Sequence, residues 1–297
     1  MRSAVEREKL HREAERRWTK LGRDHPELAA TIAAGRGLVA LYIDQLPPAP
    51  PLALTPGAAR AKLAAGVPLL ADESLDFDLP ALRRFLVALC AWASEQPERA
   101  ISRQDDGERL ARAVASGDLA ADELLAVVLA GDSADLEPIA LRLAVSGELL
   151  RSLAGFLVSA ALMAVARDLA PLLTLAGAAW GEARCPVCEG LPLLAEHQGS
   201  EGQRVLRCAT CGAGWRFPRN RCAHCGTDEP GAQHYLAAEG TEEKYRVDLC
   251  DRCHRYLKSV TAFAPTPAEL LAIDDAAMLH LEVAARERGY QPVGYGE

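Results

Sequence analysis

The sequence has few aromatic residues and no uncharged apolar run that is long enough to cross a membrane. Phe, Trp and Tyr make up 5% of its 297 residues. The stretch 153–166, "LAGFLVSAALMAVA", is apolar, but Arg167 and Asp168 end it. A helix that spans a bilayer needs about 20 such residues. We therefore expect a buried core helix over residues 148–169.

An excess of positive charge is also missing. The formal net charge is -8 and the sequence pI is about 5.5. This balance argues against a uniformly basic nucleic-acid binder, although it leaves a local basic patch open. The first residues, "MRSAVEREKLHREAERRW", are charged throughout and lack the apolar core of a secretory signal. We expect a cytoplasmic protein.

Residues 1–181 lack any motif with catalytic spacing: there is no glycine-rich phosphate loop, no His-Glu-x-x-His and no nucleophile elbow. This part is rich in Ala, Leu, Arg and Glu, and we expect an all-α domain. Asp78 is a predicted N-cap for a helix over 79–92. Its apolar stripe is formed by Leu82, Phe85, Leu86 and Leu89. Cys90 lies beside the stripe and is expected to be a small buried hydrophobe.

Cysteine is nearly absent outside one region. Cys90 stands alone, and the other eight cysteines form four Cys-x-x-Cys pairs between residues 185 and 253. A secreted disulfide scaffold would be shorter, and its cysteines would be spread out. The pairs indicate metal-binding knuckles, in which turn N–H groups point at the thiolates. The predicted metal ligands are Cys185, Cys188, Cys208, Cys211, Cys222, Cys225, Cys250 and Cys253.

The residue after the second cysteine of a knuckle tends towards positive φ, a conformation that glycine adopts at no steric cost. Gly212 and Gly226 hold this place in the second and third knuckles. Glu189 and His254 hold it in the first and fourth, where a side chain makes the turn less favourable.

Eight thiolates make two tetrahedral sulfur sites. Sequential pairing leaves 19 residues between the first two knuckles and 24 between the last two. Interleaved pairing, as in a cross-braced RING, is the alternative. We favour sequential pairing because predicted strands at 203–208, 233–238 and 244–250 fit between the pairs. Each module would then close independently, and the segment between Cys211 and Cys222 would set the angle between the modules.

The spacing leaves the role of the metal open. About eighty residues, 182–262, carry few large apolar side chains, so bound metal would supply folding free energy. His197, His224, His234 and His254 lie nearby, but eight cysteines suffice as ligands. The arginine cluster consists of Arg204, Arg207, Arg216, Arg219 and Arg221. It either neutralises the thiolates or exposes a positive surface. Trp215 either forms the small core of this domain or is an exposed interface anchor. The candidate partner-binding residues are Arg207, Trp215, Arg216, Arg219 and Arg221.

The chain returns to a helical pattern after Val260. Thr266 is a predicted cap for one helix, Pro267 suits its first turn, and Gly289 follows its end. The predicted fold class is α+β. An all-α domain over 1–181 precedes a domain of two rubredoxin-like or zinc-ribbon-like four-cysteine modules over 182–262, and a helix and tail over 263–297 follow.

The order of these motifs resembles the formate dehydrogenase accessory protein family, FdhE. The resemblance rests on "CPVCEGLPLL", "LRCATCGAGWRFPRNRCAHCG" and "YRVDLCDRCHRYLKSV". Weaker likeness covers "GRDHPELA", "AGVPLLADESLD" and "DDAAMLHLEVAARERGY". Glu189 departs from the glycine that the family often has in its first knuckle.

The resemblance implies a non-catalytic maturation factor that assists assembly or activation of the catalytic subunit of formate dehydrogenase. It also implies iron at rubredoxin-like sites formed by the eight cysteines, whereas spacing alone allows zinc equally. Two other functions stay open at this point: a rubredoxin-like redox protein, and a zinc-ribbon protein that binds nucleic acid through the arginine cluster.

Overall fold

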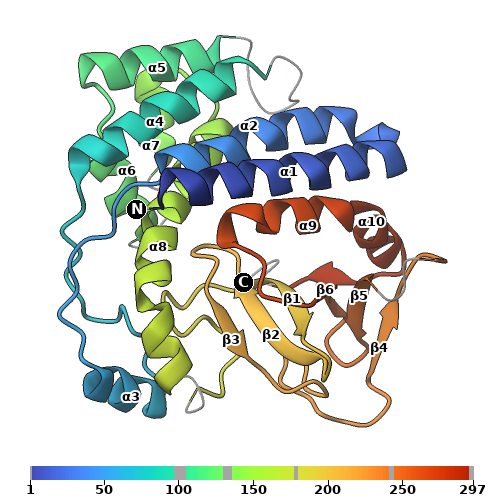
Figure 1. The fold of residues 1–297 in the computed structure, drawn as a ribbon. Helices are drawn as coiled ribbons and strands as arrows, with labels where there is room; N and C mark the ends of the chain where they lie inside the picture. Colours follow the sequence, from blue (N-terminus) through green and yellow to red (C-terminus); the bar gives the residue numbers. More distant parts are fainter. Residues whose placement is uncertain (1, 97–104, 130–135, 177–179, 241–243, 294–297) are drawn as a thin grey trace. The chain divides into compact units, whose positions relative to one another are not determined.

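The computed structural model describes residues 2–96, 105–129, 136–176, 180–240 and 244–293 (Figure 1). The chain divides into two compact units. The first is made of Met1–Pro51 and Leu75–Val165, and the second of Leu52–Ser74 and Ala166–Glu297. The first unit is helical and the second carries the β-sheet, so the predicted α+β class is confirmed.

Helices make up the first unit. They are α1 (Ala4–Asp24), η1 (Pro26–Leu28), α2 (Ala29–Gln45), α4 (Leu79–Ser94), α5 (Asp106–Ser116), α6 (Ala121–Leu129), α7 (Leu136–Leu143) and the first part of α8 (Gly147–Ala176). Tyr42 of α2 stacks on Phe85 of α4, with ring centroids 5.8 Å apart. Trp92 of α4 donates from Nε1 to the Ala34 carbonyl of α2 at 3.0 Å.

Helix α4 follows its sequence pattern closely. The Asp78 carboxylate accepts a hydrogen bond from the Ala81 N–H at 2.9 Å, as an N-cap does. The predicted stripe is fully buried: Leu82, Phe85, Leu86 and Leu89. Cys90 is buried beside it, and this burial raises the pKa of its thiol to about 12. The prediction that Cys90 is a packed hydrophobe is confirmed.

Helix α8 is longer than predicted. It continues past Arg167 and Asp168 and through Pro171, which lacks an N–H donor, and it ends at Ala176. Within the described residues, 147–175 form a helix that is long and apolar enough to cross a membrane. However, 72% of its most apolar window is buried inside the protein. Such burial is what a core helix shows.

The second unit is built on one mixed sheet. Its strands are β1 (Pro192–Gln198), β2 (Gln203–Cys208), β3 (Gly214–Arg216), β4 (Gln233–Leu236), β5 (Tyr245–Cys250), β6 (Arg255–Ala262) and β7 (Gln291–Pro292). The strand order is β3-β2-β1-β6-β5-β4, and β7 pairs with β6. The strands predicted from "QRVLRC", "QHYLAA" and "KYRVDLC" are β2, β4 and β5.

Two similar halves meet at the centre of this sheet. Each half runs knuckle, strand, antiparallel strand, knuckle, strand, which gives β1–β2–β3 in the first half and β4–β5–β6 in the second. Strand β1 of the first half pairs in parallel with β6 of the second, from Leu194 opposite Lys258 to Gln198 opposite Ala262. Each half gathers its own four cysteines, as predicted, but the two halves share one sheet instead of forming separate modules. The shared ladder, rather than the segment between Cys211 and Cys222 alone, sets their relative orientation.

Helices α9 (Leu271–Ala277) and α10 (Leu279–Glu287) cover one face of this sheet (Figure 1). The buried cluster between them joins sheet and helix residues: Leu194, Val247, Leu249, Tyr256, Val260, Leu271, Met278, Leu281, Ala285 and Tyr290. The metal-binding region thus has an apolar core that its own strands could not form alone. The predicted three-part division into 1–181, 182–262 and 263–297 stays a prediction, although the helices after residue 263 pack on the sheet.

The C-terminal helix differs from the single helix predicted. A short 3-10 turn, η4 (Ala268–Leu270), precedes α9, and Met278 separates α9 from α10. Thr266 does not cap the helix, because its backbone N–H donates to Glu196 and its hydroxyl bonds the Asp274 carboxylate.

Candidate functional site

The four knuckles have one backbone conformation. In each, the N–H of the residue after the second cysteine donates to the carbonyl of the first cysteine, at 2.8 to 3.1 Å. That residue has positive φ in all four: 63° at Glu189, 68° at Gly212, 70° at Gly226 and 54° at His254. The predicted positive φ after the second cysteine is confirmed in all four knuckles, including Glu189 and His254, where a side chain makes this conformation less favourable.

Backbone N–H groups in the turns point at the sulfurs. Within hydrogen-bonding distance, Val187 donates to Cys185 Sγ at 3.4 Å, Thr210 to Cys208 Sγ at 3.3 Å and His224 to Cys222 Sγ at 3.4 Å. Such bonds stabilise thiolates. A site of four thiolates around a divalent ion carries excess negative charge, so these donors suit a metal-thiolate centre.

The cysteines gather in the sequential pairing. One group is Cys185, Cys188, Cys208 and Cys211, and the other is Cys222, Cys225, Cys250 and Cys253. Within each group the ligand atoms lie within 4.8 Å of one another. Four sulfurs at about 2.3 Å from one ion would lie about 3.8 Å apart in a tetrahedron. The sulfur pairs nearest to one another are 3.5 to 3.8 Å apart, so each group could hold one metal ion.

Site one, the group of Cys185, Cys188, Cys208 and Cys211, is deeply enclosed. Three of its cysteines are buried, and Cys188 is partly buried. Gly190 packs against the sulfurs: a Cβ there would lie 2.9 Å from Thr210 Oγ1 and 3.0 Å from Cys208 Sγ. The backbone at Gly190 also closes the knuckle, since its carbonyl accepts the Cys185 N–H at 2.9 Å.

A remote segment holds the first knuckle in place. Residues 52–74 include α3 (Pro56–Ala64) and precede the knuckle by more than a hundred residues, yet they belong to the same unit. Leu69 and Leu70 donate their backbone N–H groups to the carbonyls of Pro186 and Val187, at 2.8 and 3.1 Å. Both acceptors lie between the two cysteines of the knuckle.

Lys62 fixes the shape of that segment. Its Nζ donates to the carbonyls of Leu69 and Ala71, at 3.1 and 2.6 Å, and to the Glu73 carboxylate at 2.5 Å. We call residues 62–73 the clamp. The clamp could not be predicted from the sequence, because no local pattern links "AGVPLLADE" to a cysteine turn.

Site two, the group of Cys222, Cys225, Cys250 and Cys253, is more open. Cys222 and Cys250 are buried, Cys253 is partly buried and Cys225 is exposed. No histidine joins either cysteine group in the described residues.

Polar side chains next to the fourth knuckle bond one another instead of a metal site. Tyr290 donates to the Asp251 carboxylate, and His234 Nδ1 lies 3.5 Å from the same carboxylate. The bond to Asp251 and burial together raise the pKa of Tyr290 to about 12.

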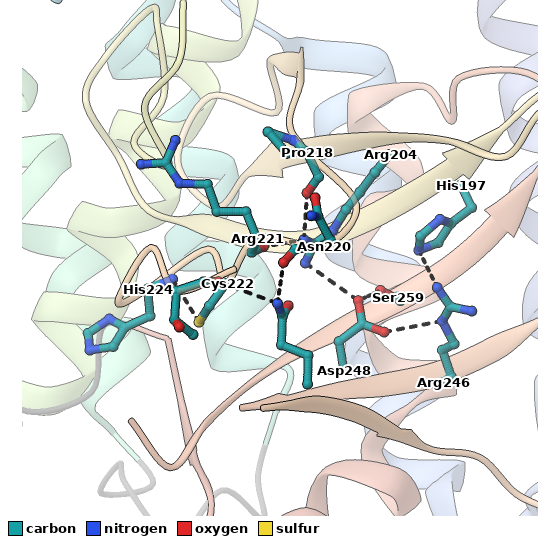
Figure 2. A network of polar contacts seen from close by, with 12 residues as sticks. His197, Arg204, Pro218, Asn220, Arg221, Cys222, His224, Arg246, Asp248 and Ser259 are labelled. Atoms are coloured by element: carbon teal, nitrogen blue, oxygen red, sulfur yellow. Dashed lines mark hydrogen bonds and ion pairs between the residues drawn. The ribbon is translucent and has the colours of Figure 1, made fainter. Parts of the chain in front are cut away.

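A polar seam crosses the junction of the two halves (Figure 2). Arg246 of β5 donates to His197 Nε2 of β1 at 2.7 Å and to Asp248 at 3.1 Å. Asp248 also accepts from Ser259 at 2.6 Å, and it lies 3.5 Å from Arg204 of β2. Burial, followed by the Arg246 guanidinium, lowers the pKa of His197. His197 is therefore a neutral seam residue rather than a ligand.

Two of the predicted partner-binding residues are internal. Arg207 is buried and donates to Glu196 at 2.9 Å and to the Thr266 carbonyl at 2.8 Å. Trp215 is buried, and its Nε1 donates to the Glu182 carbonyl at 3.1 Å. A surface role for these two is wrong, because their polar groups serve the sheet and the chain leading into it. The structure shows the other predicted alternative for Trp215, a buried core residue.

The other three predicted residues reach the surface to different degrees. Arg221 is half-buried and donates to the carbonyls of Gly226 and Gly181, both at 3.3 Å. Arg216 and Arg219 are exposed. Arg219 donates to the Glu201 carbonyl at 3.1 Å, and the Arg216 side chain makes no hydrogen bond or ion pair with the described residues. Of the five predicted residues, Arg216 and Arg219 are the two whose side chains are exposed.

The C-terminal part of the chain is similar to a known protein family. Residues 220–296 match the model described as FdhE, C-terminal domain. This region is similar to an FdhE C-terminal domain. It contains all of site two, the last strands of the sheet and the helices that cover it.

Curated relatives agree with the FdhE assignment. The Protein FdhE homolog of Pasteurella multocida is 33% identical over 112 residues, which are 37% of this chain and 35% of that protein. Protein FdhE of Escherichia coli (strain E2348/69) is 33% identical over 119 residues, 39% of this chain and 38% of that protein. The matches thus span little more than a third of the FdhE relatives. The resemblance to the FdhE family drawn from the cysteine motifs is confirmed.

The fold is shared over a greater length. The crystal structure of the FdhE protein from Pseudomonas aeruginosa superposes with a TM-score of 0.61, covering 95% of this chain and 92% of that one. The sequence identity is 22%, so this comparison shows a common fold and nothing further.

Proposed function

We propose that this protein is a cytoplasmic accessory factor that assists assembly or activation of formate dehydrogenase by binding its catalytic subunit. The observation that carries the proposal is the match of residues 220–296 to the model described as FdhE, C-terminal domain. The sheet that these residues help to form also carries the two groups of four cysteines. In this proposal the protein catalyses no reaction itself. It acts by presenting a metal-stabilised surface to the subunit.

The proposed cofactor is iron, one ion in each of the two sites. Four thiolates suit either Fe or Zn in tetrahedral geometry, and N–H···S bonds suit both. The choice of iron rests on the family resemblance, and zinc is the alternative. In either case Cys185, Cys188, Cys208 and Cys211 would hold one ion, and Cys222, Cys225, Cys250 and Cys253 the other.

Co-purification tests the proposed role. The full-length metal-loaded protein should retain the catalytic subunit of formate dehydrogenase under anaerobic conditions. Replacing a ligand, as in Cys250→Ser, should weaken that retention, because the knuckles lose the metal ion that holds their turns together. Cys90→Ala is the matched control, since it removes a buried cysteine that belongs to neither site. Failure of the wild-type protein to retain the subunit would sink the proposal.

A second function is supported by the exposure of Cys225. Electron transfer needs a redox metal close to the surface, and site two has a ligand there. A rubredoxin-like role therefore requires iron in site two. Anaerobically purified protein would then show visible thiolate-to-iron absorption that dithionite bleaches. A colourless protein with two zinc ions per chain would reject this role.

A further inference from the structure

One edge of the sheet is formed by β3. This strand ends the order β3-β2-β1-β6-β5-β4. Cys208 donates to the Ala213 carbonyl, and Phe217 donates to the Arg204 carbonyl. Antiparallel pairs alternate between hydrogen-bonded and non-bonded residues. The backbone N–H and C=O groups of Gly214 and Arg216 therefore point away from β2.

Those outward groups have no partner in the described part of the chain. Among the described residues, no backbone or side-chain hydrogen bond reaches the outer edge at Gly214 or Arg216. An edge of this kind pairs with an extended peptide when one is present. The edge offers the two donors and two acceptors of a short strand addition.

An arginine-rich cavity opens at the end of this edge. It has a volume of about 340 Å³, small for a ligand site, and it is open to solvent. Its lining is formed by Glu201, Gln203, Arg204, Arg216, Phe217, Pro218 and Arg219. Three of these residues carry guanidinium groups. One carboxylate, that of Glu201, accompanies them.

Two of the guanidinium groups are available to a ligand. Arg216 is exposed and unpaired within the described residues, and Arg219 donates only to a backbone carbonyl. Neither has a carboxylate partner within the ranges that the structure describes. Guanidinium groups bind carboxylates in bidentate fashion, which gives both charge and geometric complementarity.

Arg204 forms the buried wall of the cavity. It is 3% exposed, and it holds the loop after β3 by donating to the carbonyls of Pro218 and Arg221, at 3.2 and 2.8 Å (Figure 2). Its Nε is buried and has no acceptor in the described part of the chain. A buried donor without a partner is uncommon.

We propose that the β3 edge and this cavity bind an extended acidic segment of a partner protein. The segment adds a strand to β3 through the backbone of Gly214 and Arg216. A Glu or Asp side chain of the segment then lies between the guanidinium groups of Arg216 and Arg219. A peptide fits better than a nucleic acid, because the free backbone edge pairs with the backbone of an extended peptide.

The partner's identity rests on the proposed function, in which it is the catalytic subunit of formate dehydrogenase. The binding chemistry does not depend on that identity. The two can be tested separately.

The direct test uses synthetic probes and the full-length metal-loaded protein. A fluorescein-labelled peptide of alternating Val and Glu should bind, with its anisotropy falling as salt is added. A peptide with Gln in place of Glu, and one with Pro at the pairing positions, should each bind at least about 10-fold more weakly. Arg216→Glu and Arg219→Glu, singly and together, should weaken the Val-Glu peptide by at least about 10-fold.

Arg288→Glu is the matched control, because Arg288 is exposed and donates only to a backbone carbonyl, as Arg219 does. It should leave peptide binding unchanged. The proposal is overturned if the Val-Glu peptide does not bind at low salt, or if the proline peptide binds equally well. It is also overturned if a single-stranded oligonucleotide of the same charge binds where the peptide does not.

A second experiment measures how the same variants bind the catalytic subunit. Loss of subunit binding in the Arg216→Glu/Arg219→Glu variant, with Arg288→Glu unaffected, supports both proposals. Equal binding of the wild type and the double variant leaves the accessory role standing and overturns the identification of the subunit as the partner of this edge. If the subunit binds no form of the protein, the accessory role fails, and the peptide measurements alone decide the edge.

Discussion

The two cysteine groups, site one and site two, share one backbone turn but differ in their surroundings. Site one has three buried cysteines, a glycine against its sulfurs and the clamp of residues 62–73 on its first knuckle. Site two has an exposed ligand, Cys225, and no clamp from the helical half of the sequence in the described residues. The same ligand set can therefore serve as a closed folding element in one half of a sheet and as an accessible centre in the other.

Replacing one cysteine in each site should reveal the largest difference in stability between the two sites. Structural zinc contributes about 10–16 kcal/mol to folding in small zinc-binding peptides. Cys211→Ser should therefore unfold the second unit, because a fully buried ligand is lost. Cys225→Ser should keep the sheet and lose only the metal of site two. Metal content and thermal unfolding by circular dichroism measure both. Equal destabilisation by the two changes would contradict the difference between the sites.

Lys62→Met should loosen site one alone. The Lys62 ammonium donates to two carbonyls and to Glu73, and charged hydrogen bonds contribute about 1.5–3 kcal/mol each at most. We expect the amides of Leu69 and Leu70 to exchange faster, and site one to release metal to a chelator faster. Site two should release its metal at the wild-type rate. Lys9→Met, at an exposed lysine of α1, is the control. An unchanged release rate at site one would show that the clamp does not support it.

Gly190→Ala should have a smaller effect on the same site. The added methyl group would meet Thr210 Oγ1 and two cysteine sulfurs at 2.9 to 3.3 Å. Overpacking of this kind costs about 1–3 kcal/mol. The equivalent position in site two is Thr227, whose carbonyl accepts the Cys222 N–H at 2.8 Å. Thr227→Ala should be nearly neutral in thermal unfolding, and a larger loss there than at Gly190 would reverse our ranking.

His197 should produce the smallest effect, a pH dependence at the seam. Burial and Arg246 lower its pKa, so the folded protein favours the neutral ring. As the pH falls below the ordinary histidine pKa, the unfolded chain takes up a proton that the folded chain does not, and stability is lost. His197→Gln should remove that part of the loss. The difference in free energy of unfolding between the variant and wild type, followed from about pH 7.5 to 5.5, isolates it from thiolate protonation. A constant difference would exclude the effect.

Local features of this protein were predictable from the sequence, and long-range pairings were not. The Asp78 cap, the burial of Cys90 and the positive φ at Glu189 and His254 each depend on a few neighbouring residues. The parallel pairing of β1 with β6 joins residues about sixty positions apart, and no periodicity encodes which strand edges meet. Arg207 was misjudged for the same reason. Its burial depends on Glu196 and Thr266, which only the folded sheet brings to it.

The way the halves join has a consequence for self-association. Inside the chain, the first strand of one half pairs with the last strand of the next, β1 with β6. The strands left at the two ends are the remaining first strand, β4, and the remaining last strand, β3. Copies of the chain that repeated the internal junction would make a head-to-tail contact, which gives a ring if its rotation closes and a filament if it does not. The three-residue length of β3 and the charge of Arg216 at its rim oppose that polymerisation.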